Sequence, residues 1–284
     1  MSDHLKKILV ATDLSARSDR ALQRALTLAY ERQAELEILH VVDDTWPQKI
    51  IEQHEASAGR GIVEQIAALP ASRDVRFSTT VVRGQDYREI IRRSEEIGAD
   101  LIVLGVHRTA LRELFRGTTA ERVLRLGRKP VLVVKDPVAR SYRRVLVGAD
   151  LSVHSRRAIS VAAELAPSGE FLLVHATHVP FIGFLGREST EALVRDEQRE
   201  FEAALEKEIR ELKERLGTSA PNFKTAVMEG PVSAVIRAKM EEFQPDLIAV
   251  GTHGRTAISG LVLGSIAEDL LAEAPVDVVA VKAW

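Results

Sequence analysis

Glycine and serine residues near the end of the chain have the spacing of a phosphate-binding loop. Gly251 and Gly254 follow a short apolar run, and after nine intervening residues Gly264 and Ser265 precede a run with helical spacing. Glycine lets backbone N–H groups approach an anion closely and allows positive φ angles. The first amides of a helix and a serine hydroxyl supply further donors. The spacing therefore indicates a phosphate site that needs neither a lysine nor a metal ion.

The chain is a tandem duplication, so each half has a version of this loop. Residues 6–22 (KKILVATDLSARSDRAL) align without gaps to residues 143–159 (RRVLVGADLSVHSRRAI), with eight of 17 positions identical. DLIVLGVHRTA from Asp100 matches DLIAVGTHGRTA from Asp246 with one gap, and GTTAE from Gly117 matches GSIAE from Gly264. The seam lies near residues 136–142, so we expect one domain over residues 1–138 and a second over 142–284.

Each half alternates strand-like and helix-like segments. The expected strands are ILVAT, ELEILHVV, VRFSTTVV, DLIVLGV and PVLVV in the first half, and VLVGA, FLLVHA, FKTAVM, DLIAVG and VDVVAV in the second. Apolar strands separated by helices indicate a parallel sheet covered on both faces. The predicted fold class is α/β: two tandem doubly wound, Rossmann-like domains with five strands each. Ligands bind such sheets at the carboxyl ends of the strands, near the topological switch point, which is where the glycine loop falls.

Composition excludes several functional classes. The 284 residues include 39 Lys and Arg against 41 Asp and Glu, so the net charge of −2 gives no electrostatic basis for binding nucleic acid. There is no cysteine, which removes disulfides, thiol nucleophiles and iron–sulfur clusters. No apolar run reaches about 18 residues, and the N-terminus lacks a signal-peptide pattern, so we expect no membrane span and a cytoplasmic location.

The sequence resembles the universal stress protein family. The family signature Gly-x2-Gly-x9-Gly-Ser/Thr is matched in the second half, and both halves have an aspartate after the first strand. The resemblance spans nearly the whole chain and is similar to the tandem type. It implies an adenine nucleotide, ATP or AMP with or without Mg²⁺, and at most slow hydrolysis. It places adenine at Asp150 and the backbone of Ala176, ribose at Gly251, and phosphates at Gly254, Gly264, Ser265 and Ile266, with His253 in the same loop.

The first half departs from this signature. Its corresponding residues are Asp13, Val41, Gly105, Gly117 and Thr118. No residue matches Gly254, so Arg108 follows His107 directly and the loop is one residue shorter. We therefore expect the second half to bind nucleotide and the first half to bind it weakly or not at all.

Structural roles compete with these assignments. Asp13 and Asp150 can be helix caps or turn residues, because aspartate favours both. Ser15 and Ser152 are better interpreted as caps than as nucleophiles. His107 and His253 are interpreted as shaping the loop, since no carboxylate is placed to orient either as a base, and no catalytic residue is predicted. His175 and His178 are three apart on a strand and face opposite sides, so no metal site is predicted.

Other segments bear on partners. Val179 to Leu185 (VPFIGFL) is apolar and either enters the core or contacts an apolar ligand or a protein. Residues 189–216 predict an amphipathic helix with one apolar face: Phe201, Leu205, Ile209 and Leu212. The resemblance also implies a role for the apolar strands that close the two halves, because members of the family commonly pair these strands across a dimer. In a tandem chain the two halves can pair in this way internally, which would make an intramolecular pseudo-dimer able to form a homodimer.

Three functions compete. The leading hypothesis is a regulatory nucleotide-binding protein of the stress response. The second is a scaffold or carrier of an apolar ligand with vestigial nucleotide binding. The third is an adenylate-forming enzyme, which is disfavoured because the residues after each first strand read ATDLSARS and GADLSVHS instead of an SGGxDS-type loop.

Overall fold

The computed structural model describes residues 5–67, 69, 74–105, 117–138, 140–177, 187–217, 220–254 and 263–283. The first half contains β1 (Lys7–Thr12), α1 (Ala16–Arg32), β2 (Glu35–Val42), α2 (Gln48–Ala67), β3 (Phe77–Arg83), α3 (Asp86–Glu96), β4 (Leu101–Gly105), α4 (Thr119–Leu126) and β5 (Val131–Val134). The second contains β6 (Arg144–Gly148), α5 (Val153–Leu165), β7 (Glu170–Thr177), α6 (Arg187–Leu216), β8 (Asn222–Glu229), α7 (Val232–Phe243), β9 (Leu247–Gly251), α8 (Ser265–Glu273) and β10 (Asp277–Val281). The predicted order of strands and helices is confirmed.

The ten described strands form one sheet in the order β3-β2-β1-β4-β5-β10-β9-β6-β7-β8. Strands within each half are parallel, and β5 pairs with β10 antiparallel, with Leu132 opposite Val279. The predicted pairing of the closing strands therefore occurs within one chain. In each half the chain turns back at the first strand, so β1 lies between β2 and β4, and β6 lies between β7 and β9. These are the two topological switch points.

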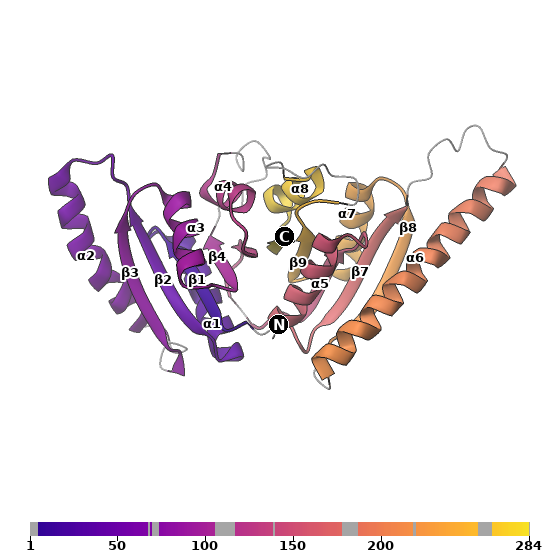
Figure 1. The fold of residues 1–284 in the computed structure, drawn as a ribbon, viewed down its shortest axis with the longest axis horizontal. Coiled ribbons are helices and arrows are strands. Elements are labelled where there is room, and N and C mark those ends of the chain that lie inside the picture. The colour runs from indigo at the N-terminus through magenta and orange to yellow at the C-terminus, as the bar shows by residue number, and fades with distance from the viewer. Residues whose placement is uncertain are drawn as a thin grey trace.

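Helices cover both faces of the sheet. The core on one face packs α1, α2, α5 and α6, and the core on the other packs α3, α4, α7 and α8 (Figure 1). Central strands are apolar on both sides, as a sheet covered on both faces requires. The predicted apolar face of α6 is confirmed, since Phe201, Leu205 and Leu212 are buried and Ile209 packs against the same core.

Two lysines join the halves reciprocally. Lys135, at the end of β5, is buried, and its Nζ donates to the carbonyls of Leu270 and Ala274 at the carboxyl end of α8, at 3.2 and 2.9 Å. Lys282, after β10, donates to the carbonyl of Arg125 in α4 at 3.1 Å. A cation at the carboxyl end of a helix satisfies free carbonyls and interacts favourably with the helix dipole. Each half therefore caps a helix of the other.

Among the described residues, no helix combines the length and apolarity needed to cross a membrane.

Candidate functional site at the carboxyl ends of the second-half strands

The predicted residues of the second half meet at the switch point between β6 and β9. Asp150 follows β6, Gly251 ends β9, Gly254 lies three residues beyond, and Gly264 with Ser265 begins α8. Gly254 is exposed, and a Cβ placed on it would lie 3.1 Å from Oδ2 of Asp150. The structure therefore brings the glycine loop and the aspartate together.

Asp150 has a structural role through one of its carboxylate oxygens. Its Oδ1 accepts the N–H of Ser152 at 2.9 Å, and Leu151 between them has a φ of 61°. Asp13 forms the same turn, accepting from the N–H of Ser15 at 3.0 Å. The turn interpretation is thus confirmed in both copies. In Asp150 this turn uses only Oδ1, so Oδ2 faces Gly254 and is available to a ligand.

The two predicted serine caps differ. Ser152 accepts the N–H of Ser155 at 3.1 Å, as an N-cap should. Ser15 stands at the N-cap position, but its side chain makes no cap bond. Its hydroxyl donates to Asp13 at 2.5 Å instead, so the predicted side-chain cap is wrong there. Hydrogen bonds from Ser15 and Ser18 outweigh burial and hold the pKa of Asp13 below its ordinary value.

The glycines serve close approach and not positive φ. Positive φ is not found at Gly251, Gly254 or Gly264, so the expectation that glycine is needed there for a positive φ is wrong. A Cβ on Gly251 would lie 2.8 Å from Cβ of His154 and 3.0 Å from the backbone nitrogen of Ser155. Gly251 thus allows the first turn of α5 to pack against the end of β9. The N–H of Gly264 donates to the carbonyl of Thr252 at 2.8 Å, so this group is not available to a ligand.

The amino terminus of α8 is the place where an anion can bind. Its N-cap is Gly264, which has no side-chain cap bond, and the next three amides belong to Ser265, Ile266 and Ala267. Such first-turn amides have no partner within their own helix. Together with the helix dipole and the Ser265 hydroxyl, they can hold a phosphate group.

The corresponding terminus in the first half is closed by its own side chains. Thr118 accepts the N–H of Glu121 at 3.2 Å, while Glu121 accepts the N–H of Gly117 at 3.2 Å, which is a capping-box arrangement. Thr119 donates its hydroxyl to Asp86 at the start of α3. Asp86 and Glu121 therefore stand at the start of α4, where the second half has Val232 and Glu268.

These two carboxylates were not predicted. The residue that aligns with Asp86 is Val232, at the same distance after a glycine with positive φ (Gly84 and Gly230). The alignment of Asp86 with Val232 therefore already showed, in the sequence, that the two halves differ at this position. Glu121 aligns with Glu268, so residue type gave no signal at that position.

Two histidines lie beside the second-half site. The rings of His154 and His253 are 5.1 Å apart, and Nδ1 of His154 accepts the N–H of Ala283 at 2.8 Å. Burial lowers the pKa of His154, and His253 adds to this effect while Asp150 opposes it. His253 is buried, and its Nε2 has no hydrogen-bond partner among the described residues.

The remaining predicted residues lie where the strands place them. Ala176 is near the carboxyl end of β7 and Val41 near that of β2, and both adjoin the core on the α3 and α7 face. Gly105 ends β4. His107, Arg108, His178 and Val179 to Leu185 lie outside the described residues.

Within the described part of the chain, no group of three His, Cys, Asp or Glu is placed to hold a metal ion.

A histidine on the second strand supports the aspartate turn in each half. Nδ1 of His40 is 2.8 Å from the carbonyl of Thr12, and Nδ1 of His175 is 2.7 Å from that of Ala149. His40 is buried and stacks on His54, while His175 stacks on Phe201 at 3.5 Å.

Protonation of His40 should destabilise the fold. Burial lowers its pKa, and the Thr12 carbonyl offsets this only in part. The unfolded chain, with a histidine pKa of about 6.5, therefore takes up the proton first as the pH falls. We expect this part of the stability to be present above about pH 6.5 and to be lost below it. The free energy of unfolding, measured with urea, should fall less between pH 7.5 and pH 5.5 in His40→Gln than in the wild type. An identical fall in the two proteins would contradict the role of His40 protonation.

Comparison with known proteins decides the family. The sequence profile described as "Universal stress protein family" matches residues 4–135 and again residues 141–282. The chain belongs to the universal stress protein family. A universal stress protein of Mycobacterium tuberculosis is 27% identical, with 97% of this chain and 96% of that protein covered. One from Methanocaldococcus jannaschii is 32% identical over 46% of this chain and 83% of its own length.

The fold of a solved universal stress protein is also similar. The crystal structure of a universal stress protein from Archaeoglobus fulgidus matches 99% of this chain and 97% of its own with a TM-score of 0.71 at 21% identity. The predicted fold class, two tandem domains of this family, is confirmed.

Proposed function

We propose that this universal stress protein is a regulatory protein of the stress response that binds one adenine nucleotide, ATP or AMP, in its second half. The observation that carries the proposal is the contrast between the two helix termini. The N-cap of α8 is Gly264, which has no side chain, whereas α4 is capped by the side chain of Thr118. Asp86, which accepts the hydroxyl of Thr119 at the start of α4, aligns with Val232 in the second half. A helix terminus with a glycine N-cap, beside a glycine loop, favours a phosphate.

The charges around the loop favour one orientation of the nucleotide. Oδ2 of Asp150 faces Gly254, and a carboxylate there repels phosphate oxygens but accepts hydrogen bonds from an amine. The exocyclic amine of adenine therefore suits the Asp150 side, with the Ala176 backbone nearby, and the phosphates suit the α8 side. Gly251 then lies beside the ribose, and Gly254, Gly264, Ser265 and Ile266 surround the phosphates. Mg²⁺, where present, would arrive as the counterion of the phosphates.

The arrangement supports binding better than rapid hydrolysis. Of the nearest titratable rings, His154 is half-buried and bonded to Ala283, and His253 is buried and bonded to Thr252. Fast phosphoryl transfer needs a positioned nucleophile and charges that stabilise the leaving group. We therefore propose at most slow hydrolysis.

The ligand that accompanies the native protein tests this function. Mass spectrometry of the protein purified without added ligand should find an adenine nucleotide at up to one per chain, and Gly254→Val should remove it. Recovery of an apolar molecule with no nucleotide, both before and after incubation with millimolar ATP, would contradict the proposal and favour a carrier.

The closed first half should be opened by removing its carboxylates. In a Gly254→Val background, Asp86→Val with Glu121→Gln should create measurable nucleotide binding, because each carboxylate near the helix terminus costs an anion about tenfold in affinity. Calorimetry should detect a dissociation constant in the millimolar range where the Gly254→Val chain alone shows none. Absence of binding in a folded triple variant would mean that the shorter loop, and not these carboxylates, closes the site.

A further inference from the structure

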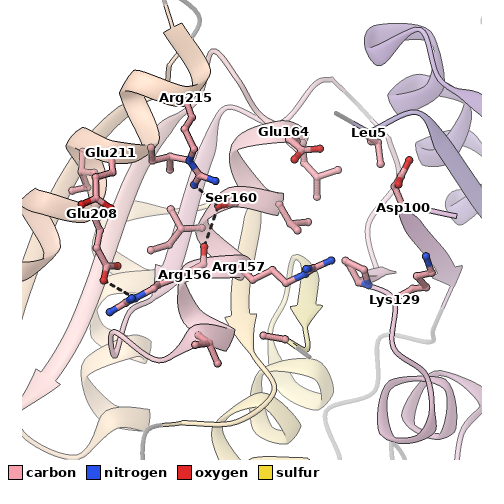
Figure 2. Close-up of a pocket in the computed structure, with 18 of the residues that line it drawn as sticks. Leu5, Asp100, Lys129, Arg156, Arg157, Ser160, Glu164, Glu208, Glu211 and Arg215 are labelled. Carbon is pink, nitrogen blue, oxygen red and sulfur yellow. Dashed lines mark hydrogen bonds and ion pairs between the residues drawn. The ribbon is translucent and has the colours of Figure 1, made fainter. Parts of the chain in front are cut away.

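Two grooves differ in how their charges select a ligand. A groove of about 970 Å³ follows α5, and its lining holds five carboxylates and four cations. Figure 2 shows one ion pair within this lining, between Arg156 and Glu208. Such a mixture favours neither sign of charge. A second groove, of about 540 Å³, lies between α7 and α8, and its lining is more selective.

The groove between α7 and α8 has an apolar floor and an acidic rim. Ile236 and Leu270 belong to the core beneath it, and Met240 packs against that core. The charged residues of its lining are three carboxylates and one guanidinium: Glu241, Asp269, Glu273 and Arg237. The one guanidinium is already paired with a carboxylate, since Arg237 on α7 lies 3.4 Å from Glu273 on α8. The groove therefore complements a ligand that has both apolar surface and positive charge.

The carboxyl ends of both helices add to this preference. Gln244 follows α7, Ala274 follows α8, and both residues line the same groove. The carboxyl end of a helix attracts cations through its free carbonyls and its dipole. Lys135, which donates to the carbonyl of Ala274, shows that this end of α8 already holds one cation.

The duplication shows what can occupy the space between two such helices. In the first half, Tyr87 of α3 packs against the core. The guanidinium carbon of Arg122 from α4 lies 5.3 Å from the centre of its ring, and that of Arg88 lies 5.8 Å from it. Nε of Arg88 also donates to the Tyr87 hydroxyl at 3.0 Å. An aromatic ring with guanidinium groups beside it therefore links α3 to α4.

The second half has lost this ring and both of its positive charges. The residues that align with Tyr87, Arg88 and Arg122 are Ser233, Ala234 and Asp269, in that order. Ser233 and Asp269 both line the groove. A small side chain thus replaces the ring, and a carboxylate replaces one guanidinium. The groove lacks the groups that its counterpart supplies from within the chain.

We propose that the groove between α7 and α8 binds a segment of a partner protein in which an aromatic side chain is flanked by arginines. The ring rests on the apolar floor beside Ser233, in the place that corresponds to Tyr87. The guanidinium groups face the carboxylates of Glu241 and Asp269. Ile266 is the one residue shared with the proposed nucleotide site, and the proposal does not depend on nucleotide binding.

Calorimetric titration of the full chain with hexapeptides of blocked termini tests the proposal. The probe is Gly-Arg-Tyr-Arg-Gly-Gly. One control peptide has alanine in place of tyrosine, and the other has glutamate in place of both arginines. The probe should bind at sub-millimolar concentration, and its affinity should fall as salt rises. The alanine peptide should bind at least about tenfold more weakly, because it buries no ring, and the glutamate peptide should not bind.

A variant that fills the groove from within has a matched control on the same helix. Ser233→Tyr restores the ring of the first half and should weaken binding of the probe at least about tenfold, because the two rings compete for one space. Ala238→Tyr adds the same ring at an exposed position of α7 that does not line the groove. It should leave the affinity unchanged.

A charge reversal tests the acidic rim and uses the duplication as its control. Glu241→Lys should weaken binding of the probe about tenfold, because it replaces an attraction by a repulsion. Glu95→Lys makes the same change at the aligned position of α3 and should have no effect. Glu241 is exposed, so this variant decides the matter even where Ser233→Tyr does not fold. Thermal melts show which variants are folded.

Several results would overturn the proposal. These are equal affinity for all the peptides, no binding at millimolar peptide, unchanged affinity in a folded Ser233→Tyr variant, and equal losses in Glu241→Lys and Glu95→Lys. Binding of 4-methylphenol by a chain that ignores every peptide would overturn it in favour of a small uncharged aromatic ligand.

Discussion

Replacing Gly254 with valine should abolish nucleotide binding, with a loss of at least about a hundredfold in affinity. A single Cβ at this position would already lie 3.1 Å from Oδ2 of Asp150, and the branched side chain of valine would crowd this carboxylate further. A misplaced group in a preformed site costs several hydrogen bonds together, each worth about 1.5–3 kcal/mol when an ion takes part. Calorimetric titration with ATP and AMP measures the loss.

A graded variant separates this effect from unfolding. Gly254 is exposed and is not among the glycines with positive φ, so substitution should change the melting temperature little. Gly254→Ala should lose much less affinity than Gly254→Val, because a contact of 3.1 Å to the end of a side chain can relax. Equal affinities for the wild type and Gly254→Val would remove Gly254 from the site.

Truncation of Asp277 should have the largest effect on stability. This carboxylate is buried where the halves meet. Its Oδ1 accepts the N–H of Lys135 at 2.8 Å, and its Oδ2 accepts the hydroxyl of Tyr142 at 2.5 Å and lies 3.3 Å from Nε of Arg24. Asp277→Ala leaves the buried guanidinium of Arg24 without its ion-pair partner and the buried hydroxyl of Tyr142 without its acceptor. Removing one partner of a buried ion pair costs about 3–5 kcal/mol of unfolding free energy.

Urea unfolding with Asp277→Asn and Glu229→Ala as companions measures this cost. The asparagine keeps one acceptor oxygen and should lose an intermediate amount, while Glu229 is exposed on the edge strand β8 and should lose almost nothing. A loss below about 1 kcal/mol for Asp277→Ala would mean that water replaces the carboxylate. The guanidinium of Arg24 also lies 4.0 Å from the centre of the Tyr142 ring, and this contact remains in every variant.

Much of the fold could be predicted because its signals are local and repeated. Apolar runs marked every strand, and the predicted alternation of strands and helices was found in both halves. The duplication fixed the positions of both aspartate turns and of the glycine loop. The pairing of β5 with β10 was also foreseen, from the resemblance to the universal stress protein family, while its antiparallel direction was not predicted.

The parts that escaped prediction depend on contacts between distant segments. Asp86 closes the first-half site only because α3 packs beside α4, and a sequence pattern does not show which helix ends meet. The side chain of Ser15 bonds to Asp13 although its position is that of a cap, so position and bonding partner are separate questions.

The stoichiometry of ATP binding to the full chain tests the central claim most directly. Isothermal titration of the wild type should give one nucleotide per chain, since α8 has a glycine N-cap while Thr118 and Asp86 bond to the start of α4. Binding of two nucleotides per chain, or none at millimolar ATP, would contradict the assignment of the site to the second half.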